Sequence, residues 1–173
     1  MIMSQITNIG SAWRYFNQNL GLQLNKISNL FSQEGIQEEG DPNKGKIGLK
    51  SKMVKDEILG PEAKMEISWE KVDPTQYHHG LKVKETIRMF SSIGVVANKK
   101  ETHWHLSHEM TYWIGNREQI VRQRYYPTII VHAIVFCELS HRVFEVHAVS
   151  MATSYAKYEQ PFLDTIFSLQ CHG

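Results

Sequence analysis

Three histidines and one glutamate in the second half of the chain have the residue types of a metal site. His103, His105 and Glu109 are spaced at i, i+2 and i+6 in the segment 101–115, ETHWHLSHEMTYWIG. Side chains alternate between the two faces of a strand, so this spacing predicts that all three share one face. His132, in a long apolar segment, could join them from an adjacent strand or could be a hydrogen-bonded core histidine. Three imidazoles and a carboxylate suit Fe, Mn, Ni, Cu or Zn.

The pattern HxHxxxE formed by His103, His105 and Glu109 resembles the first metal motif of the cupins. The resemblance implies a metal-dependent enzyme whose cofactor is a divalent transition metal. The chain departs from the family pattern, because no glycine precedes His103 at the expected distance and Ile129 replaces the glycine that should follow Pro127. Histidines on the polar face of an edge strand are usually solvated, so we favour the interpretation without a metal.

The remaining histidines and cysteines give weaker signals. His78 and His79 lie in a loop and could add a ligand, although adjacent residues rarely chelate one ion well. Cys137 lies in an apolar strand, where we expect it to be buried and unreactive. Cys171 and His172 follow the last predicted helix, where we expect neither a pocket nor oxyanion donors. Because there is no CxxC spacing, both cysteines are expected to be free thiols in a reducing compartment.

Aromatic residues gather near the predicted strand ends. They could line a groove for a ligand or peptide, or they could be cross-strand core pairs, which we favour. The five candidates for ligand binding are Trp104, Tyr112, Trp113, Tyr125 and Tyr126.

The composition favours one ordinary globular domain. A chain of 173 residues with 42% hydrophobic residues can bury a core, and 19 basic against 18 acidic residues leave a charge of +1. This balance gives no field that would attract nucleic acid. No window approaches 18 uninterrupted apolar residues, and the sequence has no GxGxxG, P-loop or GxSxG. We expect a cytoplasmic protein without a membrane span.

The N-terminal region predicts an amphipathic helix that is separate from the main domain. Apolar residues recur at steps of three and four between 11 and 32, at Trp13, Phe16, Leu20, Leu24, Ile27 and Phe31. Residues 33–45 concentrate Gly, Pro and acidic residues and predict a linker. The expected division is a helix in 1–32, a linker in 33–45 and a domain in 46–173. The helix should pack on its own domain or on a protein partner, including a second copy of the chain.

The rest of the chain predicts an α+β fold in which helices flank an antiparallel sheet. Strands are expected at 46–52, 63–69, 101–115, 129–139 and 143–151, and helices at 83–93 and from Pro161 to 169. The segment 129–139 is apolar on both faces, which predicts a strand covered on two sides. The expected core comprises Ile130, Ile134, Phe136, Phe144, Val146, Phe162 and Ile166.

The order of these elements and the closing helix PFLDTIFSLQC resemble the PsbP-like (DcrB-type) α/β/α sandwich family. The resemblance covers roughly residues 46–171 and leaves the N-terminal helix outside. It implies an accessory or binding domain that engages a protein or a small ligand, without catalysis and without a cofactor. No functional residue can be carried over from the family, because none matches a family motif.

Overall fold

The structure is a computed structural model that describes residues 4–56, 60–106 and 108–172. It contains fifteen strands in the order β1 (Ser4–Ile9), β2 (Ala12–Asn17), β3 (Leu22–Ser28), β4 (Gln37–Gly40), β5 (Lys44–Lys50), β6 (Val54–Asp56), β7 (Gly60–Pro61), β8 (Ala63–Lys71), β9 (Val95–His105), β10 (His108–Arg117), β11 (Ile120–Val121), β12 (Arg124–Tyr125), β13 (Thr128–Cys137), β14 (Arg142–Met151) and β15 (Leu169–Gln170). The helices are α1 (His79–Ser92), the short 3-10 turn Ala152–Ser154 and α2 (Tyr155–Ser168). None of the helices in the described ranges is long and apolar enough to cross a membrane.

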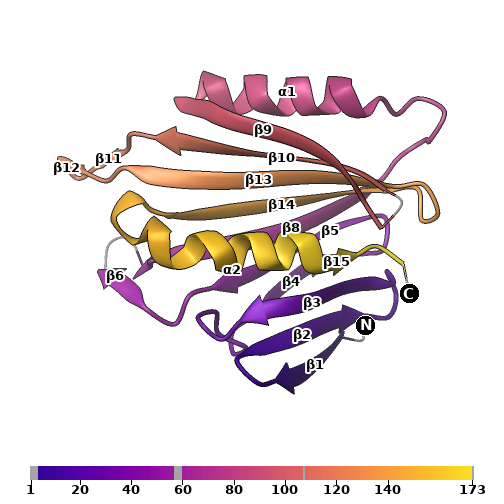
Figure 1. The fold of residues 1–173 in the computed structure, drawn as a ribbon, viewed down its shortest axis with the longest axis horizontal. Coiled ribbons are helices and arrows are strands. Elements are labelled where there is room, and N and C mark those ends of the chain that lie inside the picture. Colours follow the sequence, from indigo (N-terminus) through magenta and orange to yellow (C-terminus); the bar gives the residue numbers. More distant parts are fainter. Residues whose placement is uncertain (1–3, 57–59, 107, 173) are drawn as a thin grey trace.

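A large antiparallel sheet forms the centre of the molecule (Figure 1). Its seven strands have the order β4-β5-β8-β14-β13-β10-β9. The strands predicted at 46–52 and 63–69 correspond to β5 and β8, which are neighbours in this sheet with Ile47 opposite Ile67. β13 is buried on both faces, as the continuous apolar run predicts. Val131, Ala133, Val135 and Cys137 face the main core, whereas Ile134 and Ile130 belong to two smaller clusters on the other face.

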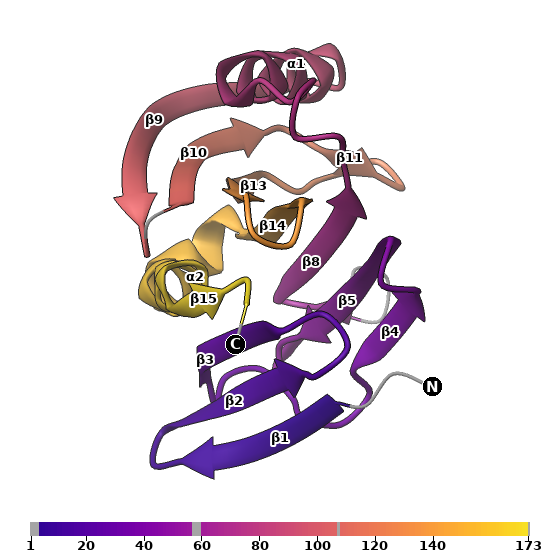
Figure 2. The ribbon, with the colours of Figure 1, turned by 90° about the vertical axis from the view of Figure 1, so that its right-hand side faces the viewer.

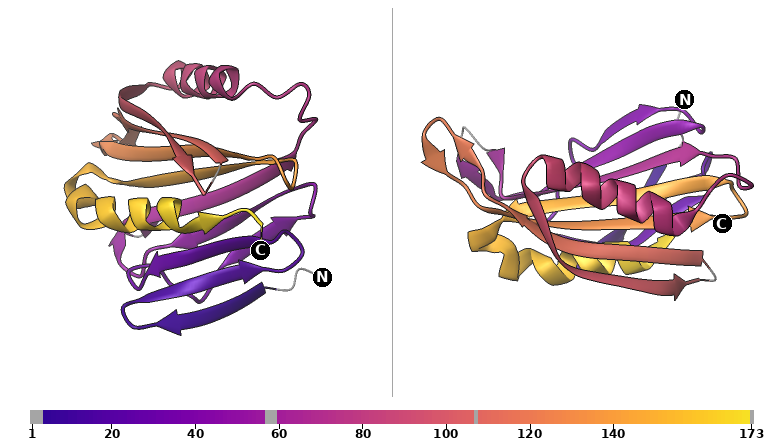
Figure 3. Two further views of the ribbon diagram at one scale, coloured as in Figure 1. Left: turned by 45° about the vertical axis from the view of Figure 1, so that its right-hand side comes forward. Right: turned by 90° about the horizontal axis from the view of Figure 1, so that it is seen from above.

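The two helices cover opposite faces of this sheet (Figure 3). α1 packs Val83, Ile87 and Phe90 against β9, β10, β13 and β14. α2 packs Tyr158, Phe162 and Ile166 into the main core on the other face. α2 begins six residues earlier than predicted, so that Pro161 lies inside the helix rather than at its start. Of the expected core residues only Phe136 is partly exposed.

The prediction of an N-terminal helix is wrong, because this region forms three strands. β1, β2 and β3 form a four-stranded antiparallel sheet with β15, and this sheet packs with α2 over the main core (Figure 2). Gly10 and Gly21 have φ values of 57° and 66°, a conformation that glycine adopts without steric cost and that suits the turns between the strands. Five of the six residues of the predicted stripe, Trp13, Leu20, Leu24, Ile27 and Phe31, are at most 4% exposed in the chain's own core. The surface predicted for self-association is therefore buried within the chain.

The segment 101–115 is not one strand but the two arms of a hairpin. β9 ends at His105 and β10 begins at His108, and these two residues lie opposite each other. Leu106 has a φ of 49° at the turn, although the sequence there has no glycine or asparagine. Gly115 lies within β10, where β9 passes close to it. A Cβ atom at Gly115 would lie 2.9 Å from both Val95 Cγ1 and the Val96 carbonyl oxygen, so the close approach of β9 requires glycine.

Candidate functional site

The face of the main sheet that carries α1 is only partly covered. α1 lies above β9 and β10, whereas β8, β5 and β4 extend beyond it (Figure 2). The residues of β5 and β8 on this open face are polar, and they include Lys44, Lys46, Glu66 and Glu70. Between these strands and the start of α1 lies a groove of about 510 Å³.

Charged side chains of both signs line the groove. Lys44, Lys46 and Lys82 supply its cations, and Glu39, Glu70 and Glu145 supply its anions. The closest pairs join Lys44 Nζ to Glu70 Oε1 at 3.7 Å, Lys46 Nζ to Glu66 Oε2 at 3.5 Å, and Lys82 Nζ to Glu145 Oε2 at 3.6 Å. The Lys44–Glu70 and Lys46–Glu66 pairs are exposed, and exposed ion pairs contribute roughly 0 to 1 kcal/mol each, so a charged ligand can replace these two at little cost. The Lys82–Glu145 pair is more buried, with side chains 34% and 25% exposed.

A buried layer of histidines lies beside the groove, beneath α1. His132 Nδ1 is 3.1 Å from His147 Nδ1, and His132 Nε2 is 3.1 Å from Glu145 Oε1. Phe90 of α1 stacks on the His147 ring with 5.1 Å between centroids. Burial raises the pKa of the Glu145 carboxyl, but the hydrogen bond and charge of His132 and the charge of Lys82 outweigh it and hold this pKa below its ordinary value. This layer links the groove, which Glu145 lines, to the surface on which α1 packs through Phe90.

Acid should weaken the fold through His147. Burial lowers the pKa of His147 to about 4, and the charge of His132 adds to this shift. The unfolded chain has a histidine pKa of about 6.5, so between these values it binds more protons than the folded chain and stability rises with pH. We expect this residue to remove on the order of 3 kcal/mol of unfolding free energy as the pH falls from about 6.5 to about 4. Urea denaturation at several pH values should show a smaller loss in His147→Gln. An equal loss would contradict this assignment.

The four residues of the predicted metal set do not meet at one point. His103 and His105 lie on the face toward α2, where His103 lies 6.0 Å from Phe167 between ring centroids and His105 Nε2 is 2.9 Å from the Leu169 carbonyl oxygen. Glu109 and His132 lie on the opposite face, because the turn at Leu106 reverses the chain between His105 and Glu109. A sheet therefore separates the two halves of the set, and they cannot share an ion.

The aromatic residues predicted to bind a ligand are also dispersed. Trp104 is 75% exposed at the edge strand β9. Tyr112 and Trp113 are neighbours in β10 and point to opposite faces, where both are buried. Tyr112 donates a hydrogen bond of 2.6 Å to Glu101, and this bond is the main reason that the pKa of Glu101 falls to about 2. Tyr125 is exposed and donates to Glu118, while Tyr126 is buried at the far end of the sheet. None of these residues lines the groove.

A cluster of two cysteines and two histidines lies where the chain leaves β15. The prediction of free thiols is wrong, because Cys137 and Cys171 form a disulfide with Cα atoms 6.2 Å apart. The expected absence of a pocket is also wrong, since Cys171 and His172 line a cavity of about 200 Å³ together with His105 and His108. One potential ligand atom from each of Cys137, Cys171, His108 and His172 lies within 4.8 Å of the others. The cytoplasmic location stays a prediction.

Sequence patterns contained only part of this information. The alternation in KGKIGLK and AKMEISWEK predicts a polar face on β5 and β8, and that face is the groove floor. The Cys/His cluster joins residues from β10, β13 and the segment after β15, so no local spacing indicates it. The side chain that holds His108, Glu138, follows Cys137 directly but carries no motif.

The comparisons with known proteins define the fold class. The chain has the PsbP-like (DcrB-type) α+β fold, with a large antiparallel sheet and two helices. It is similar to the solution structure of the cyanobacterial PsbP protein CyanoP from Synechocystis, with a TM-score of 0.59, 9% identity and 95% of each chain covered. It is also similar to the protein of unknown function PA94 from Pseudomonas aeruginosa, a putative regulator, with a TM-score of 0.53, 9% identity and 96% of each chain covered. No family model and no curated protein matches the sequence. Because it covers 95 to 96% of the chain, the structural similarity extends beyond residues 46–171.

Proposed function

We propose that this protein is a non-catalytic binding domain that holds a segment of a partner protein in the groove beside α1. The observation that supports this proposal is the uncovered half of the main sheet, where a groove of about 510 Å³ has cations and anions in its walls. A ligand matched to this groove carries charges of both signs.

The spacing of the groove charges favours an extended peptide over a small ligand. Lys44 and Lys46 lie on one face of β5, and residues two apart on a strand are about 6.6 to 6.8 Å apart. Glu70, which also lines the groove, and Glu66, which lies outside its lining and pairs with Lys46, are on the same face of the adjacent strand β8, about 4.8 Å away. An extended peptide has the same spacing between alternate side chains. Each of its charged side chains can therefore form an ion pair with one groove residue in place of that residue's present partner.

Charge reversal in the groove should weaken peptide binding. As a probe we choose a capped hexapeptide with serine at every second position and Lys and Glu alternating at the positions between, so that one face of the extended peptide carries both charges. It is titrated into the full chain and followed by two-dimensional ¹⁵N–¹H NMR. We expect the amide signals of β5 and β8 to shift, and Lys46→Glu to weaken binding at least about tenfold. An attraction of up to about 1 kcal/mol becomes a repulsion of similar size, so the total change is roughly 1.4 to 2 kcal/mol.

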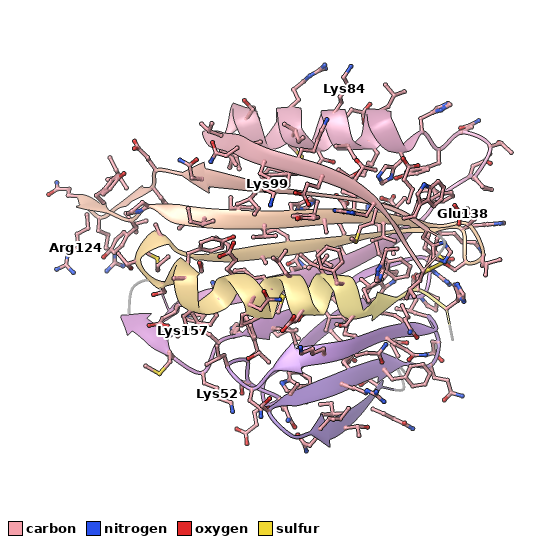
Figure 4. The ribbon with its side chains drawn as sticks, viewed as in Figure 1. Lys52, Lys84, Lys99, Arg124, Glu138 and Lys157 are labelled. Atoms are coloured by element: carbon pink, nitrogen blue, oxygen red, sulfur yellow. A yellow bond between two sulfur atoms is a disulfide. The ribbon has the colours of Figure 1, made fainter. Side chains whose placement is uncertain are left out.

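Lys52→Glu is the matched control, since Lys52 is exposed and lies on another side of the molecule (Figure 4). It should leave the titration unchanged. Free lysine and free glutamate form the second arm of the experiment. If the amide signals of β5 and β8 shift with these amino acids but not with the peptide, the result would favour a small ligand instead. An absence of shifts in both arms would overturn the groove as the binding site.

A further inference from the structure

The Cys/His cluster at the end of α2 has the composition of a structural zinc site. Its four members, Cys137, Cys171, His108 and His172, come from the end of β13, the start of β10 and the segment after β15. Structural zinc sites of the Cys₂His₂ type use two thiolates and two imidazole nitrogens in a tetrahedron. We propose that, once the disulfide is reduced, these four residues bind one Zn²⁺ ion.

The distances between the ligand atoms fit a tetrahedron around zinc. With Zn–S bonds of about 2.3 Å and Zn–N bonds of about 2.0 to 2.1 Å, tetrahedral ligand atoms lie roughly 3.3 to 3.8 Å apart. In the structure the ligand atoms are all within 4.8 Å of one another, and the two Nε2 atoms of His108 and His172 are 3.0 Å apart. Small side-chain rotations therefore suffice to open the sulfur pair and admit the ion.

Glu138 orients His108 as the second shell of a metal site would. The distance from His108 Nδ1 to Glu138 Oε2 is 2.7 Å, so Nδ1–H donates to the carboxylate and the lone pair of Nε2 points into the cluster. Glu138 lies at the end of the molecule where the chain leaves β15 (Figure 4). A carboxylate that holds the outer nitrogen of a ligating histidine fixes the tautomer and raises the basicity of the ligand.

The site is enclosed but can be reached. Cys137, Cys171 and His108 are at most 5% exposed, whereas His172 is exposed and covers the cluster from outside. A cavity of about 200 Å³ adjoins the cluster. An ion can enter beside His172 and then be shielded from water by the other three ligands.

The disulfide and the zinc ion exclude each other, because each uses both sulfur atoms. Reduction by two equivalents of a low-molecular-weight thiol breaks the S–S bond, gives two cysteine thiols and leaves the reductant as its own disulfide. Binding of Zn²⁺ then forms two Zn–S bonds and releases the two thiol protons. The same four residues thus hold the C-terminal segment on the sheet in either redox state.

Zinc binding should depend on the redox state of the full chain. Protein reduced with a phosphine and dialysed against excess Zn²⁺ should retain about one zinc ion per chain by elemental analysis, and oxidised protein should retain almost none. Cobalt added to reduced protein should give the visible bands of tetrahedral cobalt and a thiolate charge-transfer band. Reduced protein that retains no more zinc than oxidised protein would overturn the site.

Variants identify the ligands. Cys137→Ser and His172→Ala should each lower the retained zinc and alter the cobalt spectrum, and His172→Ala carries the test if Cys137→Ser fails to fold, because His172 is exposed. Glu138→Gln should weaken zinc binding about 10- to 100-fold without removing a ligand. His103→Ala is the matched control, a histidine of the adjacent strand outside the cluster, and it should change nothing. Equal losses in His103→Ala would show adsorption on surface histidines and would reject the proposal.

Discussion

Deletion of residues 1–40 should abolish cooperative folding. These residues include β1, β2 and β3 as well as β4 of the main sheet, and four of their side chains in the main core, Trp13, Leu22, Leu24 and Phe31, are 0% exposed. Their removal exposes one side of α2, and loss of a single large buried side chain already costs about 2 to 5 kcal/mol. A typical domain has only about 5 to 15 kcal/mol of stability. Urea denaturation followed by circular dichroism should show no cooperative transition for the fragment 41–173.

Deletion of residues 1–9 provides the matched control for this experiment. Among the residues that the structure describes, it removes only β1, an edge strand whose six residues are all exposed. We expect this shorter deletion to leave a cooperative transition with a modestly lower midpoint. A fragment 41–173 that unfolds as cooperatively as the full chain would instead support the separate N-terminal unit suggested by the sequence.

Phe162→Ala should cause the largest loss of stability among single substitutions in α2. Phe162 is 0% exposed and contacts Phe31 and Tyr158, with ring centroids 6.0 Å away in both cases. The substitution leaves a cavity where the N-terminal strands meet the helix, at an expected cost of about 3 to 5 kcal/mol. For a chain of this length the melting temperature should fall by roughly 6 to 20 °C, measured by calorimetry.

Phe167→Ala is the same substitution on the same helix at a position that is 39% exposed. Because less apolar surface is lost, we expect less than half the effect of Phe162→Ala. Equal losses at the two positions would show that α2 does not pack against the core as described.

Sequence periodicity predicts the elements whose burial is uniform along their length. β13, β14 and the buried faces of both helices follow from their apolar patterns, because each packs against one environment along its length. The start of α2 does not follow, since the helix begins six residues before the predicted position. The N-terminal strands cannot be predicted in this way, because each turn between two strands shifts the phase of the alternation of apolar and polar residues. Trp13 and Tyr15 alternate within β2 and Leu22 and Leu24 within β3, and the turn between the strands brings the apolar positions into a spacing of three and four. Gly21, unfavourable within a helix, was the signal against the helix.

The candidate sites follow from the sequence to a lesser degree. The predicted metal set is not brought together, because the chain turns at Leu106 between His105 and Glu109. The sequence has no glycine or asparagine there to indicate the turn, so the alternation of a single strand extends across it. The Cys/His cluster depends on contacts between residues 108, 137 and 171, which are about 30 to 60 positions apart. Such a site requires knowledge of which strands are neighbours, and single-sequence patterns do not supply it.

The pairing of β15 with β3 has a consequence for folding during synthesis. Leu169 lies opposite Leu24, so β3 can pair with β15 only after a segment about 145 positions later in the chain has been synthesised. At about 5 to 20 residues per second, ribosomes need roughly 7 to 30 s to make the intervening chain. During this interval Leu22, Leu24 and Ile27, which end in the core, have neither α2 nor β15 to cover them. The nascent chain therefore presents an apolar strand with an open edge, which makes it a substrate for chaperones that bind extended apolar segments.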